Sequence, residues 1–243
     1  MSDEGAREAE LATQLARVEE RIATACAAAG RARSEVTLVV VSKTYPASDV
    51  RLLAGLGVRE FAENRDQEAS EKAAACADLP LVWHFVGQLQ TNKVRSVAGY
   101  ADYVHSVDRV KLINALSAAS VRRDGPSLNC LIQVALEKES GLGEGRGGAA
   151  PAEVGELARA VTEAQGLRLA GLMTVAPLTG PHAGSPATAF ARLIEISRDL
   201  RAIDPAASMV SAGMSGDLEE AIAAGATHVR VGSAVLGVRP TLG

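Results

Sequence analysis

Residues 36–46 read VTLVVVSKTYP, and this stretch decides between two architectures. It opens with a run of apolar and β-branched residues, which predicts a strand buried on both faces, as the strands of parallel sheets are. An open doubly wound sheet would place a GxGxxG turn at the end of its first strand. Here the strand ends in Ser42, Lys43 and Thr44 without a glycine, which favours a closed barrel.

The same alternation of an apolar strand and a helical segment recurs along the chain after this stretch. Strands that alternate with helices indicate βαβ units, and eight units in about 200 residues are typical of a (β/α)8 barrel. We therefore predict an α/β fold, a TIM barrel in one domain over residues 1–243, with an additional helix over residues 4–29 before the first strand. The predicted strands cover residues 36–43, 58–64, 81–87, 102–108, 127–136, 167–175, 207–213 and 227–232.

Composition excludes several classes of protein. The 25 basic and 29 acidic residues give a net charge of −4, which argues against a nucleic-acid partner, because binding to phosphates needs a basic face. Cys26, Cys76 and Cys130 form no CxxC pair, so a reducing compartment is expected. The acidic start does not resemble a secretory signal, and no apolar run approaches the ~20 residues that cross a bilayer. We expect a cytoplasmic protein without a membrane partner, and its charge and core size fit a monomer.

Lys43 is the most unusual residue of the opening strand. It shares a strand face with Val39 and Val41, so its side chain is expected to point into the barrel mouth. Apolar surroundings disfavour the ammonium form and leave a nucleophilic amine, which is what a Schiff base with an aldehyde requires. The alternative is a lysine that extends its charge into water at a strand end.

Small residues follow the last two predicted strands, in the sequence VSAGMSGDLEEAIAAG over residues 210–225 and in THVRVGSAVLG over residues 227–237. Asp217, with Glu220 three residues later, is expected to cap the helix that follows the seventh strand. The loops after strands seven and eight are where barrels commonly hold a phosphate. Together with Lys43, they point to a phosphorylated aldehyde. The residues expected at the phosphate are Ser215, Gly216, Gly232 and Ser233.

Arg230 lies inside the last strand, between Val229 and Val231. A guanidinium has only donors, so an inward-facing arginine needs an acceptor. One interpretation is an ion pair with a barrel acid such as Glu63. The other is a hydrogen bond to the ring nitrogen of a cofactor, which would weaken the ring as an electron sink.

The remaining candidates are histidines and a cysteine at strand positions. His84 and His105 lack a further ligand at metal spacing, so hydrogen-bonded core histidines are favoured over a metal site. No metal is expected. Cys130 on the fifth strand is expected to be an inert, buried thiol.

Seven motifs occur in the order of a known family. They are VVSKTYP at 40–46, AENRDQE at 62–68, WHFVGQLQTNK at 83–93, HSVD at 105–108, GLMTVAP at 171–177, SAGMSGD at 211–217 and VRVGSAVLG at 229–237. Through these motifs the whole chain resembles the pyridoxal-phosphate homeostasis proteins, which are relatives of the alanine racemase barrel domain. Ala62, Ala135 and Ala212 depart from the family's usual Gly, Asn and Met.

The resemblance implies a pyridoxal 5′-phosphate (PLP) site at the barrel mouth. Lys43 would hold PLP as a Schiff base, and Arg230 would approach the pyridine nitrogen. The phosphate would lie on Ser211, Ser215, Gly232 and Ser233, and the pocket near the ring would be lined by Asn64, His84 and Met214.

Three functions are compatible with this pattern. The chain ends at Gly243 directly after the eighth unit, so we expect no further domain that supplies a second catalytic base, and Tyr45 is the only tyrosine expected at the rim. This favours a PLP carrier in vitamin B6 homeostasis that exchanges PLP with acceptor enzymes. The alternatives are a weak PLP-dependent amino-acid racemase and a cofactor-free isomerase that uses Lys43 and Glu63 on a sugar phosphate.

Overall fold

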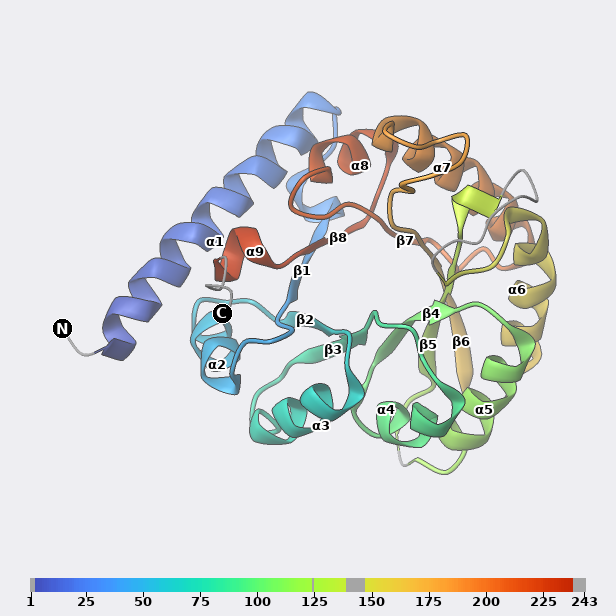
Figure 1. The fold of residues 1–243 in the computed structure, drawn as a ribbon, viewed down its shortest axis with the longest axis horizontal. Helices are drawn as coiled ribbons and strands as arrows, with labels where there is room; N and C mark the ends of the chain where they lie inside the picture. The colour runs from blue at the N-terminus through green and yellow to red at the C-terminus, as the bar shows by residue number, and fades with distance from the viewer. Residues whose placement is uncertain (1–2, 124, 139–146, 238–243) are drawn as a thin grey trace.

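The computed structural model describes residues 3–123, 125–138 and 147–237. Its eight strands are β1 (Thr37–Val41), β2 (Glu60–Glu63), β3 (Val82–Phe85), β4 (Tyr103–Val107), β5 (Leu128–Gln133), β6 (Leu167–Met173), β7 (Met209–Ser211) and β8 (His228–Val231). They are parallel and follow one another around a closed barrel in sequence order (Figure 1). The barrel closes because β1 pairs with both β2 and β8. The predicted (β/α)8 architecture is therefore confirmed.

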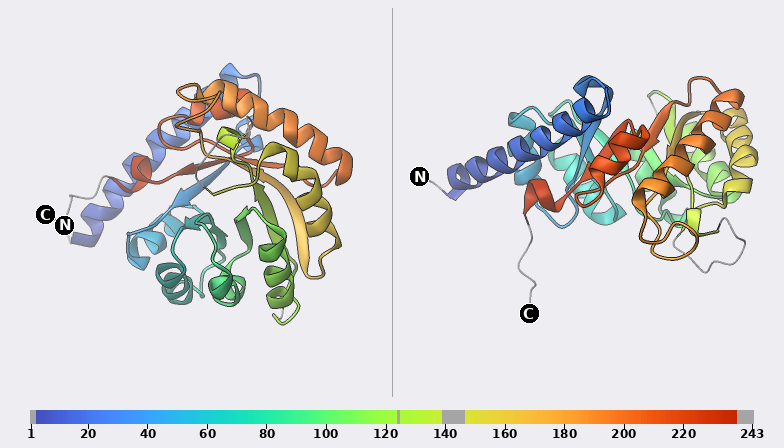
Figure 2. Two further views of the ribbon diagram at one scale, coloured as in Figure 1. Left: turned by 45° about the vertical axis from the view of Figure 1, so that its right-hand side comes forward. Right: turned by 90° about the horizontal axis from the view of Figure 1, so that it is seen from above.

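Helices surround the barrel (Figures 1 and 2). They are α1 (Asp3–Ala28), α2 (Ala47–Gly55), α3 (Asp66–Ala75), α4 (Val94–Tyr100), α5 (Val110–Ser120), α6 (Val154–Glu163), α7 (Pro186–Ile203), α8 (Leu218–Ala224) and α9 (Ser233–Leu236). The additional helix α1 packs on the outside against α2, α8 and α9. No described helix is both long enough and apolar enough to span a membrane.

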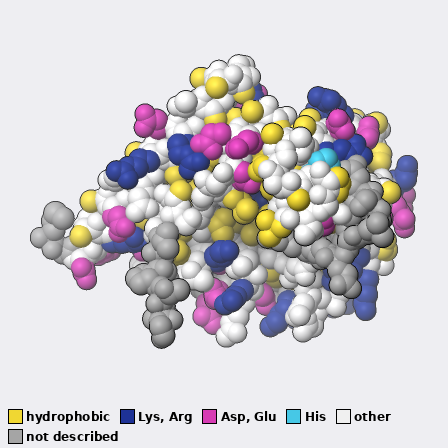
Figure 3. Space-filling model, turned by 45° about the horizontal axis from the view of Figure 1, so that its top comes forward, with side chains coloured by type: hydrophobic (Ala, Val, Ile, Leu, Met, Phe, Trp, Pro, Cys, Tyr) yellow, Lys and Arg dark blue, Asp and Glu magenta, His cyan; other side chains and the backbone are white. Residues whose placement is uncertain are grey.

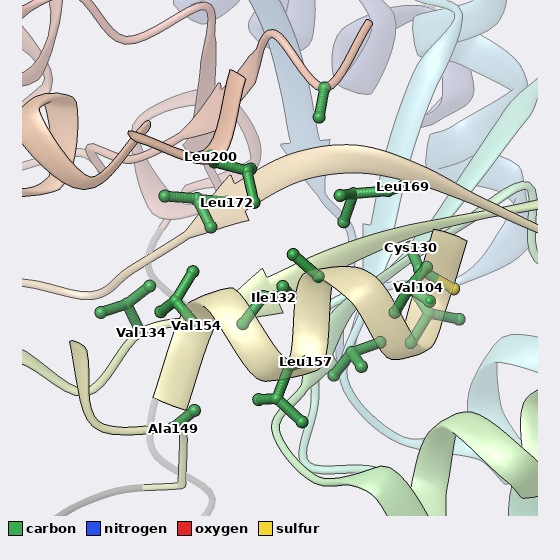
Figure 4. Packing of buried hydrophobic residues seen from close by; sticks show 14 of the residues in the cluster. Val104, Cys130, Ile132, Val134, Ala149, Val154, Leu157, Leu169, Leu172 and Leu200 are labelled. Atoms are coloured by element: carbon green, nitrogen blue, oxygen red, sulfur yellow. The ribbon is translucent and has the colours of Figure 1, made fainter. Parts of the chain in front are cut away.

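Alternation along each strand separates two environments. In β1, Leu38 and Val40 belong to the apolar layer under the helices, whereas Val39 lies opposite Arg230 of β8 and faces the barrel interior. The outer layer is mostly apolar. Figure 4 shows Val154 and Leu157 of α6 packed on β5 and β6, and burial of each such side chain stabilises the fold by about 1.5–3 kcal/mol.

Three segments differ in detail from the predictions. The helices expected at 91–98 and 151–165 begin with 3-10 turns, Thr91–Lys93 and Pro151–Glu153, before α4 and α6. The short helix α9 was not predicted as a helix, because four residues are too few for periodicity to show. Most of the glycine-rich loop predicted over residues 138–151 lies outside the described residues, since 139–146 are not among them.

Candidate functional site

The carboxyl ends of the strands bring the predicted site residues of β7 and β8 together around Arg230. The Arg230 side chain is 4% exposed, and Nη1 donates to Ser211 Oγ (2.6 Å) while Nη2 donates to the carbonyl oxygen of Thr174 (2.8 Å). Burial lowers the pKa of Arg230 to about 10, partly offset by the charge of Asp217. At neutral pH the guanidinium is therefore a buried cation whose direct partners in the described chain are uncharged oxygens.

Two histidines continue from Ser211 across the barrel interior. Ser211 Oγ lies 3.1 Å from His105 Nδ1, and His105 Nε2 lies 2.8 Å from His84 Nδ1. His84 Nε2 contacts Glu60 Oε2 at 2.5 Å, and the His84 ring stacks on Tyr103 with a centroid separation of 4.6 Å. The prediction of hydrogen-bonded core histidines is confirmed. Within the described ranges, no group of three His, Cys, Asp or Glu side chains is arranged to hold a metal ion.

Lys43 lies at the rim and is exposed, so the expectation of an apolar pocket around it is wrong. β1 ends at Val41, and Lys43 is exposed in the turn that follows. The turn starts early because Thr44 has a φ of +68°, unusual for a β-branched residue, and its N–H donates to Glu68 Oε2 (3.2 Å). No acid pairs with the Lys43 amine within the described chain, so the amine is available to a ligand.

Glu63 faces away from the mouth, toward α3. Its carboxylate is fully buried, accepts a hydrogen bond from Ser42 Oγ (2.6 Å) and pairs with Lys72, which is 6% exposed. Lys72 Nζ also donates to the carbonyl oxygen of Ser42 (2.7 Å). Arg230 and Glu63 are therefore not paired, so that interpretation is wrong. The cofactor-free isomerase would need Glu63 at the barrel mouth beside Lys43, and Glu63 does not face the mouth.

The loop after β7 is folded by a glycine and an aspartate. Gly213 has a φ of +89°, and a Cβ there would lie 2.6 Å from that of Ala221, so only glycine fits this turn. Asp217 precedes α8 as predicted, but its carboxylate accepts from Met214 N–H (2.6 Å) instead of forming a capping box with Glu220. This contact closes the loop and leaves the intervening Ser215 and Gly216 at its tip.

The loop after β8 approaches β1. A Cβ on Gly232 would lie 3.2 Å from the carbonyl oxygen of Val41, so the end of β8 lies beside the strand that leads to Lys43. Ser233 is exposed at the first position of α9. The structure thus brings Lys43, Gly232 and Ser233 to one side of the mouth.

Helix α1 forms hydrogen bonds to the loop after β7 and to the segment after β8 from outside the barrel. Arg21 donates to the carbonyl oxygen of Ser215 (3.0 Å) and forms a bidentate pair with Glu219. Arg7 donates to the carbonyl oxygen of Leu236 in α9 (2.9 Å) and pairs with Asp49 of α2. The additional helix therefore sets the position of both segments predicted to bind phosphate.

The other predicted residues are more scattered. Asn64 is half-buried and lines a cleft of about 520 Å³ between the ends of β2 and β3, whereas Met214 is 39% exposed beside Ser215. The hydroxyl of Tyr45 donates to the carbonyl oxygen of Gly237 (2.6 Å). Cys130 is buried as predicted, and burial raises the pKa of its thiol to about 12.

Comparison with known proteins identifies the family. The family model described as alanine racemase, N-terminal domain, matches residues 13–240. The pyridoxal phosphate homeostasis proteins of Pseudomonas aeruginosa and Escherichia coli are 45% and 38% identical to this chain, over 94% and 95% of it and 96% and 97% of their own lengths. The chain belongs to the pyridoxal phosphate homeostasis protein family. PipY of Synechococcus elongatus, solved with PLP bound, is 33% identical with a TM-score of 0.76, covering 93% of this chain and 100% of its own.

Several residues of the site in this pyridoxal phosphate homeostasis family member were not predicted from the sequence. Glu60 carried a signal, because it shares the inward strand face of Ala62 and an acid inside a barrel needs a partner. Lys72 carried none, since a lysine on a helix is ordinarily solvated. Arg21 and Thr174 act through contacts between residues far apart in the sequence, 194 residues in the case of Arg21 and Ser215.

Proposed function

We propose that this protein binds PLP at the carboxyl end of the barrel and holds it through Lys43 as a carrier that serves vitamin B6 homeostasis. The observation that supports this most is the combination of two groups on neighbouring strands. One is the exposed amine of Lys43, which pairs with no acid among the described residues, and the other is a buried cation, Arg230, on β8. Relatives over the full chain are named for PLP homeostasis, and PipY was solved with PLP.

The residues present fit PLP chemically. PLP supplies an aldehyde that condenses with a lysine amine, a phosphate and a pyridine nitrogen. Arg230 is buried, and within the part of the chain that the structure describes two of its five N–H groups have protein partners, so donors remain for a ligand. A Cβ at Gly216 would meet no atom within 4 Å, which leaves room for a phosphate at this loop.

We assign the contacts as follows. Lys43 forms the covalent link, Arg230 donates to the pyridine nitrogen, and backbone N–H and hydroxyl groups of Ser215, Gly232 and Ser233 hold the phosphate. Asn64 and Met214 border the ring. Ser211 and His84, expected at the cofactor, act instead from within the barrel, because the Ser211 hydroxyl is fully buried and already bonds Arg230 and His105.

The partners and setting are part of the same proposal. PLP-dependent enzymes that lack cofactor would accept PLP from this protein, which we propose acts as a monomer in the cytoplasm. The free and buried state of Cys26, Cys76 and Cys130 supports a reducing compartment.

Absorption spectroscopy tests the proposal. Titration with PLP should give the wild-type protein a saturable near-visible band that differs from that of free PLP. Lys43→Ala should abolish the band, whereas Lys111→Ala, which removes an exposed lysine on α5, should leave it unchanged. A band that survives in Lys43→Ala, or its absence from the wild-type protein, would overturn the proposal.

Incubation with amino acids of one configuration separates a carrier from a racemase. The carrier should leave the optical purity of L- or D-alanine unchanged over hours. Sustained loss of optical purity that requires Lys43 would favour the weak racemase instead.

A further inference from the structure

Five side chains inside the barrel form one continuous hydrogen-bonded series, which we call the interior chain. It runs from Arg230 through Ser211, His105 and His84 to Glu60, with contacts of 2.5–3.1 Å. Glu60 is the first residue of β2, at the amino end of the barrel, whereas Ser211 is the last residue of β7. The interior chain therefore connects the two ends of the barrel.

The chemistry of its two ends fixes the direction of every hydrogen bond. A guanidinium only donates, so Ser211 Oγ accepts from Arg230 and its own hydrogen is directed to His105 Nδ1. His105 then carries its hydrogen on Nε2 and donates to His84 Nδ1. His84 in turn carries its hydrogen on Nε2 and donates to Glu60, because an ionised carboxylate only accepts.

Burial and neighbouring charge favour the same protonation state. His105 is fully buried, and burial lowers its pKa well below the ordinary value, assisted by His84, Arg230 and His228. Around His84 lie Glu60 of β2, His105 and Tyr103 of β4 and His228 of β8. Arg230 of β8 lies near His105 and His228. A hydrogen on His84 Nδ1 would lie against the Nε2–H of His105, so the single polarity requires His84 Nδ1 to be an acceptor.

We propose that Glu60, His84 and His105 are positioning residues that hold the Arg230 guanidinium in one orientation toward the cofactor ring, through a hydrogen-bonded chain of a single polarity. The inference rests on the proposed function, which assigns Arg230 to the pyridine nitrogen. Glu60 contributes the negative charge at one end of the interior chain, although it lies at the opposite end of the barrel from Lys43.

The cofactor-free protein tests the polarity without any ligand. Long-range ¹H–¹⁵N spectra of protein labelled at its four histidines should show His84 and His105 as Nε2–H tautomers at pH 7, and His105 should keep this tautomer down to pH 6. In Glu60→Gln, the Nε2–H signal of His84 should move upfield because an amide oxygen is a weaker acceptor. An Nδ1–H tautomer or a charged ring at either histidine at pH 7 would overturn the inference.

PLP binding tests the consequence for Arg230. Glu60→Gln and Ser211→Ala remove hydrogen bonds at opposite ends of the interior chain. Each should weaken PLP binding at least fivefold and shift the pH midpoint of the absorption band of protein-bound PLP. Glu156→Gln, which removes an exposed charge on α6, should change neither. Unaltered affinity and pH midpoint in both interior variants would overturn the inference even if the wild-type protein binds PLP, whereas a wild-type protein that does not bind would overturn only the proposed function.

Discussion

At the scale of single residues, Lys72 and Glu63 form a buried ion pair directly behind the site. Lys72 also donates to the carbonyl oxygen of Ser42, the residue before Lys43. An unpaired charge in such a position is costly, because desolvation is no longer offset by attraction to its partner. The pair therefore couples the stability of the barrel to the position of the turn that presents Lys43.

We expect Lys72→Met to lower the free energy of unfolding by about 3–5 kcal/mol, because it leaves the Glu63 carboxylate buried with Ser42 alone. The double variant Lys72→Met/Glu63→Leu should recover most of this loss. Urea unfolding followed by circular dichroism measures both, with Lys111→Met on the exposed face of α5 as the control, expected within about 0.5 kcal/mol of wild type. A single variant as stable as that control would contradict the role of the pair.

The sequence indicated core positions for some polar side chains, but not their partners. An inward-facing Arg230 was considered and His84 was expected to be a core histidine, and both are buried inside the barrel. That Arg230 bonds Ser211 and Thr174, and not Glu63, depends on the register between strands and on which face of β2 Glu63 occupies. The exposure of Lys43 depends on the left-handed backbone conformation of Thr44. This conformation was not predictable, because β-branched residues rarely adopt it.

At the scale of elements, α1 holds the two segments after β7 and β8 that we propose to bind phosphate. Its arginines reach the loop after β7 and the helix after β8, and its buried face is apolar, with Leu11, Val18 and Ile22 in the core. This helix was predicted over residues 4–29, and it is observed over Asp3–Ala28. The contacts of Arg7 and Arg21 were not predictable, because arginines on the polar face of a helix are usually solvated.

Arg21→Ala should weaken PLP binding about fivefold, the factor that corresponds to loss of roughly 1 kcal/mol for one hydrogen bond, because Ser215 loses the contact that fixes its carbonyl group. Stability should fall by less than about 1 kcal/mol, since the ion pair with Glu219 is largely exposed. The matched control is Arg51→Ala, which removes another exposed bidentate pair, with Asp78. Spectroscopic titration with PLP gives the affinities, and equal affinity in both variants would contradict this role of α1.

At the scale of the whole molecule, the repetition of strand and helix was sufficient to predict the barrel. Every one of the eight predicted strands overlaps an observed one. Burial on both faces leaves an apolar run in strands such as β1, and the regular alternation with helical segments indicated the more polar strands β2 and β8. The surface agrees with the composition: in Figure 3, acidic and basic side chains are interspersed over the visible face. The histidines buried within the barrel add a dependence of stability on pH.

Stability of the cofactor-free protein should decrease as the pH falls below 6.5. Burial lowers the pKa of His228 to about 4 and that of His105 well below its ordinary value. Between pH 6.5 and pH 5 the unfolded chain therefore binds more protons than the folded chain, and each histidine lowers the free energy of unfolding by up to about 1.4 kcal/mol per pH unit. Urea unfolding at pH 7.5 and pH 5.5 measures this loss, which His228→Gln should reduce; equal stability at both pH values would contradict it.

Borohydride reduction of the protein after incubation with PLP, followed by peptide mass mapping, tests the covalent role of Lys43 most directly. We predict a reduced pyridoxyl phosphate group on the peptide that contains Lys43, in nearly one equivalent per chain. Modification of other lysines in its place, or of none, would contradict the assignment.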